Sequence, residues 1–402
     1  MASKSGVAYS NNSSSQEAGI EAAKKAMASL GGGKVNLCVV YTTSKHNPQL
    51  IRDGIRSVIG KDAKIIGGYA VGIITNDNLS YGGYEVGVAL ISSDVAKFDL
   101  YKEKGLGTGN EIQVGKKLGE KIKKDGHGKN AGMVLMYDSV RGETASLLNM
   151  ATPLIEGLDQ SFGQNWPAAA GAGLLGDMQF QPTQQWFNDE IDTQSAMALV
   201  VSGGARMDTI IMHGCKPSSG YHKITKTDGP VVLEIDNKPA TDVIAELLGS
   251  DKSWEEYPLF VTLGVNQGKK FEDFNEDNYA NRLCMAVDQK RKGLVMFEPD
   301  LKAGDEFQLM RRDINFNYVG ERAEKLFSQL GTRKPFFALY IDCAGRASAY
   351  CGTDKEEAAE VQRVVGSKVP ILGLYSGVEV AKVGAKVQAL DWTGVLCVFS
   401  EA

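Results

Sequence analysis

Polar and reactive side chains gather after two apolar runs near the end of the chain. Phe336 to Ile341 and Val369 to Leu374 are short and apolar, which predicts two buried strands. Residues 354–365 between them repeat apolar side chains at helical spacing, so a helix should join the strands. Strands joined by a helix are usually parallel, so both ends meet at one sheet edge, where α/β folds bind ligands. The side chains that follow the two strands are Asp342, Cys343, Arg346, Tyr375, Ser376 and Glu379. We expect them to bind a small ligand, with Arg346 or Glu379 holding a charged group.

Two of these residues also suggest covalent chemistry. Cys343 lies three positions before Arg346, and a guanidinium near a thiol favours the reactive thiolate. A buried, inert cysteine beside a structural arginine explains the same spacing. Ser376 lies in a glycine-flanked turn that resembles a nucleophile elbow, but one position late for G-x-S-x-G, and no histidine is placed as its base. A thiol or serine enzyme using Cys343 or Ser376 is therefore an alternative, while our expectation is that the protein is not an enzyme.

Other motifs are less informative. Cys215 and Lys216 are flanked by His213 and His222, which are the best histidine candidates for a metal or haem, although a lone histidine is more often structural. The sequence has no H-E-x-x-H and no paired C-x-x-C, so nothing supports a structural zinc site. Gly171 to Gly176 matches G-x-G-x-x-G, but a proline follows and helical periodicity is missing, so no dinucleotide site is expected.

The strand–helix–strand pattern recurs twice earlier in the chain. The first copy has strands in residues 35–42 and 63–69, and the second has strands in 133–137 and 166–170 around a helix predicted from Glu143 to Leu158. A weaker copy is expected over residues 231–297. We interpret the pattern as duplication of one unit. The segments predicted to occupy equivalent places are Ile65 to Ala70, Ala168 to Gly173 and Ile371 to Ser376.

Composition narrows the function classes. The chain has 402 residues, of which 43% are hydrophobic and 23% charged, as in a globular protein with a sizeable core. A net charge of −5 argues against nucleic-acid and anionic-membrane partners. No run of 18 apolar residues and no signal peptide are found, so we expect a cytoplasmic location. The six cysteines are scattered and should be reduced, with no disulfide.

Several motifs, in their order and spacing, resemble the FIST family of sensory proteins, which pair a FIST N with a FIST C domain. The motifs are Gly214–Pro217, Ile224–Lys226, Glu234–Ala240, Gly304–Asp313, Cys343-x-Gly345-Arg346, Gly373–Val380 and Asp391–Gly394. The resemblance covers nearly the whole chain and implies a FIST N domain at residues 1–228 and a FIST C domain at 229–402. It implies a mixed α/β fold, with two domains built from repeated β-α-β-β units in a layered sandwich whose helices lie outside the sheets.

The resemblance also implies a function. It suggests an intracellular sensor that binds a small ligand, possibly an amino acid, and signals through a separate partner protein. Some bacterial proteins similar to it bind haem and report nitric oxide, so a haem-binding nitric-oxide sensor is the alternative; no histidine here can be matched to their haem ligand. The turn at Gly67 to Ile73 lacks the polar residues usual in the family, whereas Gly173 and Asp177 of the second turn are kept. Gly173, Asp177, Cys215 and Lys216 therefore join the ligand-binding candidates.

Overall fold

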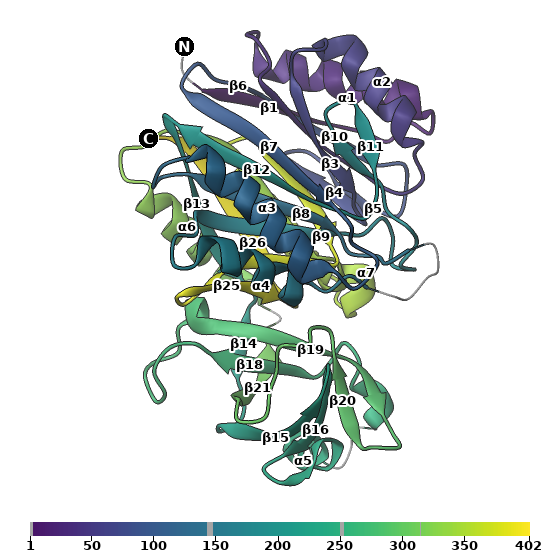
Figure 1. Ribbon diagram of the computed structural model, residues 1–402. Coiled ribbons are helices and arrows are strands. Elements are labelled where there is room, and N and C mark those ends of the chain that lie inside the picture. The colour runs from purple at the N-terminus through teal and green to yellow at the C-terminus, as the bar shows by residue number, and fades with distance from the viewer. Residues whose placement is uncertain (1–2, 143–147, 250–252, 314) are drawn as a thin grey trace.

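The computed structural model describes residues 3–142, 148–249, 253–313 and 315–402, and most of them form three copies of one unit (Figure 1). Each copy contains strand, helix, strand, helix, strand, hairpin and strand. Repeat one comprises β1 (Lys4–Ser10), α1 (Ser15–Leu30), β2 (Leu37–Thr42), α2 (Pro48–Ile59), β3 (Lys64–Tyr69), β4 (Gly72–Thr75), β5 (Leu79–Tyr81) and β6 (Val86–Ser92). Repeat two comprises β7 (Ala96–Lys104), α3 (Glu111–Asp125), β8 (Gly132–Asp138), α4 (Ala151–Phe162), β9 (Ala168–Leu174), β10 (Gln185–Phe187), β11 (Glu190–Asp192) and β12 (Ser195–Gly203).

Repeat three follows the same order with one long insertion. It comprises β13 (Ala205–Met212), α6 (Asn317–Gln329), β22 (Pro335–Cys343), the short helix α7 (Ser348–Cys351), α8 (Glu357–Gly366), β23 (Ile371–Ser376), β24 (Val378–Val383), β25 (Lys386–Leu390) and β26 (Gly394–Glu401). The equivalent strands β3, β9 and β23 contain the three segments predicted to correspond, except that Ala70 directly follows β3, so the predicted duplication is confirmed. In each repeat this strand pairs in parallel with the strand before the crossover helix.

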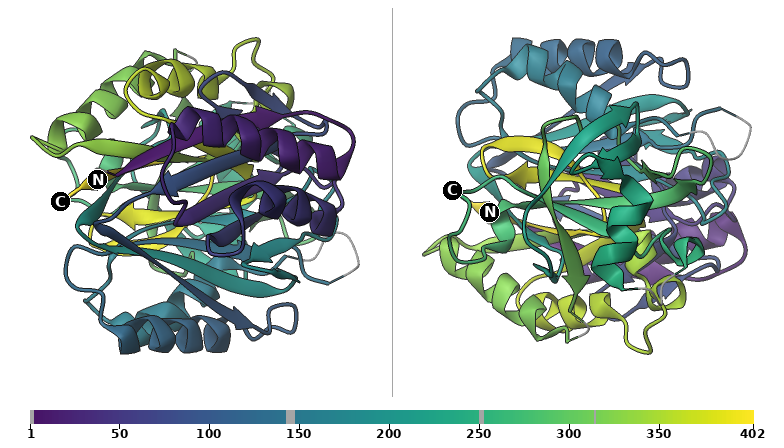
Figure 2. Two further views of the ribbon diagram at one scale, coloured as in Figure 1. Left: turned by 90° about the horizontal axis from the view of Figure 1, so that it is seen from above. Right: turned by 90° about the horizontal axis from the view of Figure 1, so that it is seen from below.

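The hairpins tie the repeats together. Hairpin β4–β5 of repeat one pairs with β23 of repeat three, β10–β11 of repeat two pairs with β3, and β24–β25 of repeat three pairs with β9. Each six-stranded sheet is therefore completed by a neighbouring repeat. The three helix pairs lie around the outside of the sheets (Figure 2), and the inner faces share one apolar core that includes Tyr41, Met136 and Leu339. The mixed α/β class and the helices outside the sheets are confirmed.

The insertion between β13 and α6 forms a small β-barrel that lies below the repeats in Figure 1. Its elements are β14 (Cys215–Pro217), β15 (His222–Asp228), β16 (Val231–Ile235), β17 (Lys238–Pro239), α5 (Ala240–Leu248), β18 (Thr262–Asn266), β19 (Tyr279–Asp288), β20 (Gly293–Met296) and β21 (Glu306–Arg312). The ring closes because β18 pairs with both β19 and β21. Its own apolar core includes Ile235, Leu263 and Phe307.

Two sequence predictions are wrong. Residues 231–297 are not a weaker copy of the repeat, because their strands pair antiparallel around the barrel and α5 does not cross over to a parallel strand. The helix predicted from Glu143 begins at Ala151; residues 143–147 lie outside the described part of the chain. The two-domain division at residue 228 stays a prediction. Among the described residues, no helix is long and apolar enough to cross a membrane.

Candidate ligand site

The strand ends of repeat three hold a buried ion-pair network around Arg346. The predicted parallel pairing is confirmed, with Asp342 opposite Tyr375 and Cys343 opposite Ser376. The Arg346 guanidinium donates to the carbonyl oxygens of Met212 at 2.7 Å and Trp392 at 3.1 Å. It also pairs with Glu357 of α8 and lies 3.0 Å from Asp342 Oδ1. Arg346 therefore links the ends of several strands to α8, and its side chain is 1% exposed.

Asp342 has hydrogen-bonding capacity that the protein does not use. Its two carboxylate oxygens and the hydroxyl of the neighbouring Tyr340 are buried, with no hydrogen-bond partner among the described residues. The ion pair with Arg346 lacks hydrogen-bond alignment. Burial raises the pKa of Asp342 to about 7, while the Arg346 guanidinium acts in the opposite direction.

Glu379 and Ser376 form a second buried contact. The Ser376 hydroxyl lies 2.8 Å from Glu379 Oε1, and the backbone N–H of Thr393 donates to the other carboxylate oxygen at 3.4 Å. Burial raises the pKa of Glu379 well above its usual range. Tyr375 donates to Glu356 at 2.5 Å and packs edge-on against Tyr81 of repeat one. All of these polar groups thus have contacts inside the protein.

The thiol alternative loses its physical basis here. Burial raises the pKa of Cys343 well above its usual range, and the Arg346 guanidinium faces carboxylates rather than the thiol. All six cysteines are free, so the prediction of no disulfide is confirmed for the structure. Ser376 has no histidine among its hydrogen-bond partners in the described part of the chain.

The remaining predicted residues are dispersed. Cys215 is buried, with its pKa raised to about 12 by burial, whereas Lys216 is exposed and pairs with Asp313 at 3.3 Å. Gly173 lies inside β9, where a Cβ would come within 2.8 Å of the Tyr137 hydroxyl oxygen. Asp177 lines an open pocket. Their role as ligand contacts stays a prediction.

The histidines do not converge on one site. His213 is buried at the end of β13, and its Nε2 has no hydrogen-bond partner among the described residues. Burial lowers the pKa of His213 to about 4. His222 instead pairs with Asp236 at 2.8 Å on the barrel.

A crevice of about 500 Å³ opens at the strand ends of repeat one. One wall is formed by the residues that follow β2 and start α2, and the other by the connection that leaves β9 of repeat two. The lining residues are Ser44, Pro48, Gln49, Tyr69, Asp177, Gln181, Pro182 and Gln184. The crevice lies at the carboxyl ends of two parallel strands, the usual ligand position in an α/β sheet.

The two walls of the crevice carry opposite electrostatic character. On one wall, Asp177 accepts from Ser44 Oγ at 3.2 Å and from the backbone N–H of Gln179 at 2.9 Å. It has no cationic partner among the described residues. On the other wall, Asn47 caps α2 by accepting from the N–H of Leu50 at 3.0 Å, while the N–H of Gln49 has no acceptor in the described structure. The positive end of the α2 dipole thus faces a carboxylate.

The equivalent place in repeat two is closed by a carboxylate of the protein itself. There the end of β8, the start of α4 and the connection after β23 enclose a cavity of about 10 Å³, room for about one water molecule. Glu298 of the barrel reaches into it and accepts from the N–H groups of Ala151 at 3.0 Å and Thr152 at 2.8 Å. The geometry of the repeat therefore accommodates a carboxylate at the start of its second helix. In repeat three, Arg346 and Glu357 fill the corresponding position.

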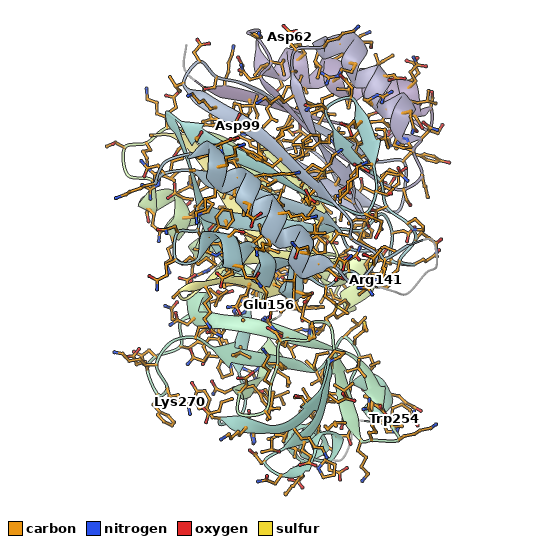
Figure 3. All side chains as sticks on the ribbon, viewed as in Figure 1. Asp62, Asp99, Arg141, Glu156, Trp254 and Lys270 are labelled. Atoms are coloured by element: carbon orange, nitrogen blue, oxygen red, sulfur yellow. The ribbon has the colours of Figure 1, made fainter. Side chains whose placement is uncertain are left out.

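A larger groove of about 1210 Å³ separates the barrel from α4 and β25. Arg282 forms part of its lining but is held by Asp300 and by the carbonyl oxygen of Ala389 at 3.0 Å. Its other charged groups, such as Lys382 and Lys386, are exposed, and Glu156 lies at this junction in Figure 3. The groove has charges but few groups held in place for a ligand.

Sequence reasoning missed most of the crevice. The turn at Gly67 to Ile73 does lack polar groups apart from Tyr69, but the polar side chains come from the β2–α2 loop and from another repeat. Ser44 lies two residues after a predicted strand, and that position is the signal that could have identified it; Gln49 lies further on, in the first turn of α2. Gln181 and Gln184 follow Asp177 in a segment without periodicity, so nothing in the sequence places them beside Ser44.

Comparison with known proteins identifies two domains. The FIST N domain matches residues 36–238, and the FIST C domain matches residues 240–382. An uncharacterized protein of Methanocaldococcus jannaschii is 26% identical over 159 residues, which are 36% of this chain and 29% of that relative. The chain therefore spans less than a third of that relative's length.

Two solved structures with similarity over the whole chain are enzymes. Cyanuric acid hydrolase from A. caulinodans aligns over 99% of both chains with a TM-score of 0.41 and 9% identity. A chorismatase aligns over 100% of this chain and 99% of its own, with a TM-score of 0.35 and 9% identity. The expectation that the protein is not an enzyme is corrected accordingly, because these similar structures catalyse reactions. Similarity at this level transfers no activity to the chain.

Proposed function

This chain belongs to the FIST family, whose domains are signalling sensors, and from that premise we propose that it senses an amino acid bound in the crevice of repeat one. The observation that carries the proposal is the carboxylate of Glu298, which occupies the equivalent position in repeat two and bonds to the first turn of α4. In repeat one, the same position is open. The carboxylate of a ligand at this position can accept a hydrogen bond from the N–H of Gln49 and is stabilised by the positive end of the α2 dipole.

The opposite wall accounts for the second charge of the ligand. Asp177 uses part of its acceptor capacity on Ser44 and on two backbone N–H groups, and a carboxylate has about four acceptor positions. An ammonium group can therefore pair with Asp177 without displacing these contacts. A simple anion would be repelled by Asp177, and a simple cation would face the positive end of α2. A zwitterion satisfies both walls.

The remaining lining residues favour a polar ligand side chain. Gln49, Gln181 and Gln184 offer amide donors and acceptors around the opening. The ring of Tyr69 forms an aromatic wall and is fixed because its hydroxyl donates to the carbonyl oxygen of His46 at 2.7 Å.

The position of the crevice supports a sensing role. Ser44 belongs to repeat one and Asp177 to repeat two, so a ligand between the walls joins two repeats. A ligand that binds one arrangement of the repeats more tightly shifts the population toward it. We propose that a separate protein recognises that arrangement. In this proposal the buried residues Asp342, Arg346 and Glu379 hold the strand ends in place.

The proposal is tested by thermal shift with the twenty amino acids, acetate and methylammonium. A ligand at a hundred times its Kd stabilises the folded protein by about 2.7 kcal/mol. We expect at least one amino acid to raise the Tm and neither acetate nor methylammonium to do so at the same concentration. Equal shifts from acetate, or no shift from any amino acid, would contradict the proposal.

A further inference from the structure

Arg312, at the end of β21, is a half-buried arginine without a carboxylate partner among the described residues. It lies over the ring of Trp392, with 3.2 Å from the guanidinium carbon to the ring centroid, and donates to the carbonyl oxygen of Leu259. No ion pair of Arg312 occurs within the described parts of the chain, and its Nε is buried without an acceptor. Burial lowers the pKa of Arg312 to about 10. Buried charges in proteins are normally paired, and the buried Nε of Arg312 has no acceptor among the described residues.

Both residues that contact the guanidinium have strained backbones. Trp392 has a φ of 51° and Leu259 a φ of 61°, in the left-handed region that bulky residues rarely adopt. Such strain costs on the order of 1–3 kcal/mol per residue and concentrates at functional sites. The strained backbone around Arg312 therefore lowers the stability of the fold, and the contacts of Arg312 inside the protein do not explain this loss.

Large apolar side chains are exposed on the chain segments that lead to and pair with Leu259, which contacts Arg312. Leu259 is 42% exposed, and its backbone N–H pairs with Cys284, which places Met285 next to it. Trp254 lies five residues before Leu259 in the chain and is 40% exposed. Figure 3 shows Trp254 on the side of the barrel away from Lys270. The set Trp254, Leu259 and Met285, together with Arg312, is called the Arg312 surface below.

We propose that the Arg312 surface binds an acidic, apolar segment of a partner protein. One carboxylate of that segment pairs with Arg312, and its apolar side chains cover Leu259, Trp254 and Met285. Tryptophan and arginine are the residues most enriched among those that dominate binding energy in protein interfaces. Arg312 has no counter-ion in the described parts of the chain, which favours an acidic partner, and the exposed apolar side chains favour a partner that is also apolar. A small anion would leave the apolar residues uncovered.

The surface is separate from the crevice of repeat one, and its occupant does not depend on what the crevice binds. It lies on the barrel, at the junction with Trp392 of repeat three. The barrel is the part of the chain that interrupts the repeats, so a partner held there contacts both the insertion and the repeat that carries it.

Two labelled eight-residue peptides test the proposal on the full-length protein. Both have leucine and phenylalanine around a central residue, which is glutamate in one and glutamine in the other. Fluorescence polarisation should show the glutamate peptide binding about tenfold more tightly or better, since a hydrogen bond to a charged group contributes that much. Arg312→Gln should remove this difference. Arg311→Gln, which changes the exposed neighbouring arginine on the same strand, should keep it.

A second variant separates the apolar contribution from folding. Trp254→Ser should weaken both peptides by a similar factor while circular dichroism stays unchanged. An unchanged glutamate preference in folded Arg312→Gln, or binding of neither peptide, overturns the proposal. Acetate that competes as well as the peptide would indicate a small-anion site and also overturn it. If the protein self-associates in sedimentation experiments and Arg312→Gln abolishes this, the surface binds a second copy of the chain, and the proposal is overturned.

Discussion

Replacing Arg346 with methionine should destabilise the fold strongly rather than remove a ligand contact. The guanidinium is 1% exposed and pairs with Asp342 and Glu357 while donating to two backbone carbonyls. Without it, two buried carboxyl groups lose their cation. Removing one partner of a buried ion pair costs about 3–5 kcal/mol. For a chain of 402 residues, that loss corresponds to a fall in Tm of roughly 4–6 °C.

The dependence of this loss on pH identifies its cause. Burial raises the pKa values of Asp342 and Glu357, and removal of Arg346 should raise them further. A carboxyl whose folded pKa lies above its unfolded pKa favours folding at low pH, and that contribution disappears as the pH rises through the folded pKa. The Tm difference between parent and Arg346→Met should therefore be larger at pH 8 than at pH 5.

Differential scanning calorimetry at both pH values is the assay. Arg363→Met is the matched control, because Arg363 forms an exposed pair with Glu360 that contributes at most about 1 kcal/mol. If Arg346→Met changes the Tm no more than this control, or equally at pH 5 and pH 8, then the network does not stabilise the strand ends as described.

Three further outcomes follow from the same contacts. Asp391→Asn should reduce the loss of unfolding free energy between about pH 4 and pH 7, as measured by urea unfolding. Burial raises the pKa of Asp391 to about 7, whereas asparagine does not titrate and still accepts from the Leu283 N–H. An unchanged dependence of the unfolding free energy on pH would contradict this. Glu298→Ala should lower the free energy of unfolding by about 1–2 kcal/mol and speed amide hydrogen exchange at the start of α4, and Glu298→Gln should have a smaller effect. Equal exchange rates in the parent and both variants would exclude the capping role. Gly214→Ala should lower the Tm, because Gly214 has a φ of 60° and an added Cβ would lie 2.6 Å from the ring of Tyr318; an unchanged Tm would show that both can relax.

The repeat could be predicted from sequence because its signal is local. The strands around Ile65, Ala170 and Leu372 are continuous apolar runs, each followed by small residues, and the structure places all three in equivalent strands. The exchange of hairpins could not be predicted, since it depends on pairing between residues as distant as Ile74 and Gly373. The barrel was misread because a strand–helix–strand pattern in sequence does not reveal whether the strands pair in parallel.

The candidate site was predictable only in part. The strand ends at Asp342 and Tyr375 are adjacent, as parallel pairing requires, but burial and internal partners there depend on Glu357 and Trp392, which pattern reasoning did not place. Asp177 was selected from the family resemblance of its turn. Its partner Ser44 lies in another repeat, and only the tertiary structure brings the two walls together.

Calorimetry with Asp177→Asn tests the central claim most directly. The ligand is the amino acid that gives the largest thermal shift, and the matched control is Glu156→Gln, a carboxylate in the larger groove beside the barrel. We predict that Asp177→Asn weakens binding by about tenfold or more, since it removes the partner of the ammonium group, and that Glu156→Gln leaves it unchanged. Parent-like affinity in Asp177→Asn, or a greater loss in Glu156→Gln, would place the ligand outside the crevice and contradict the account.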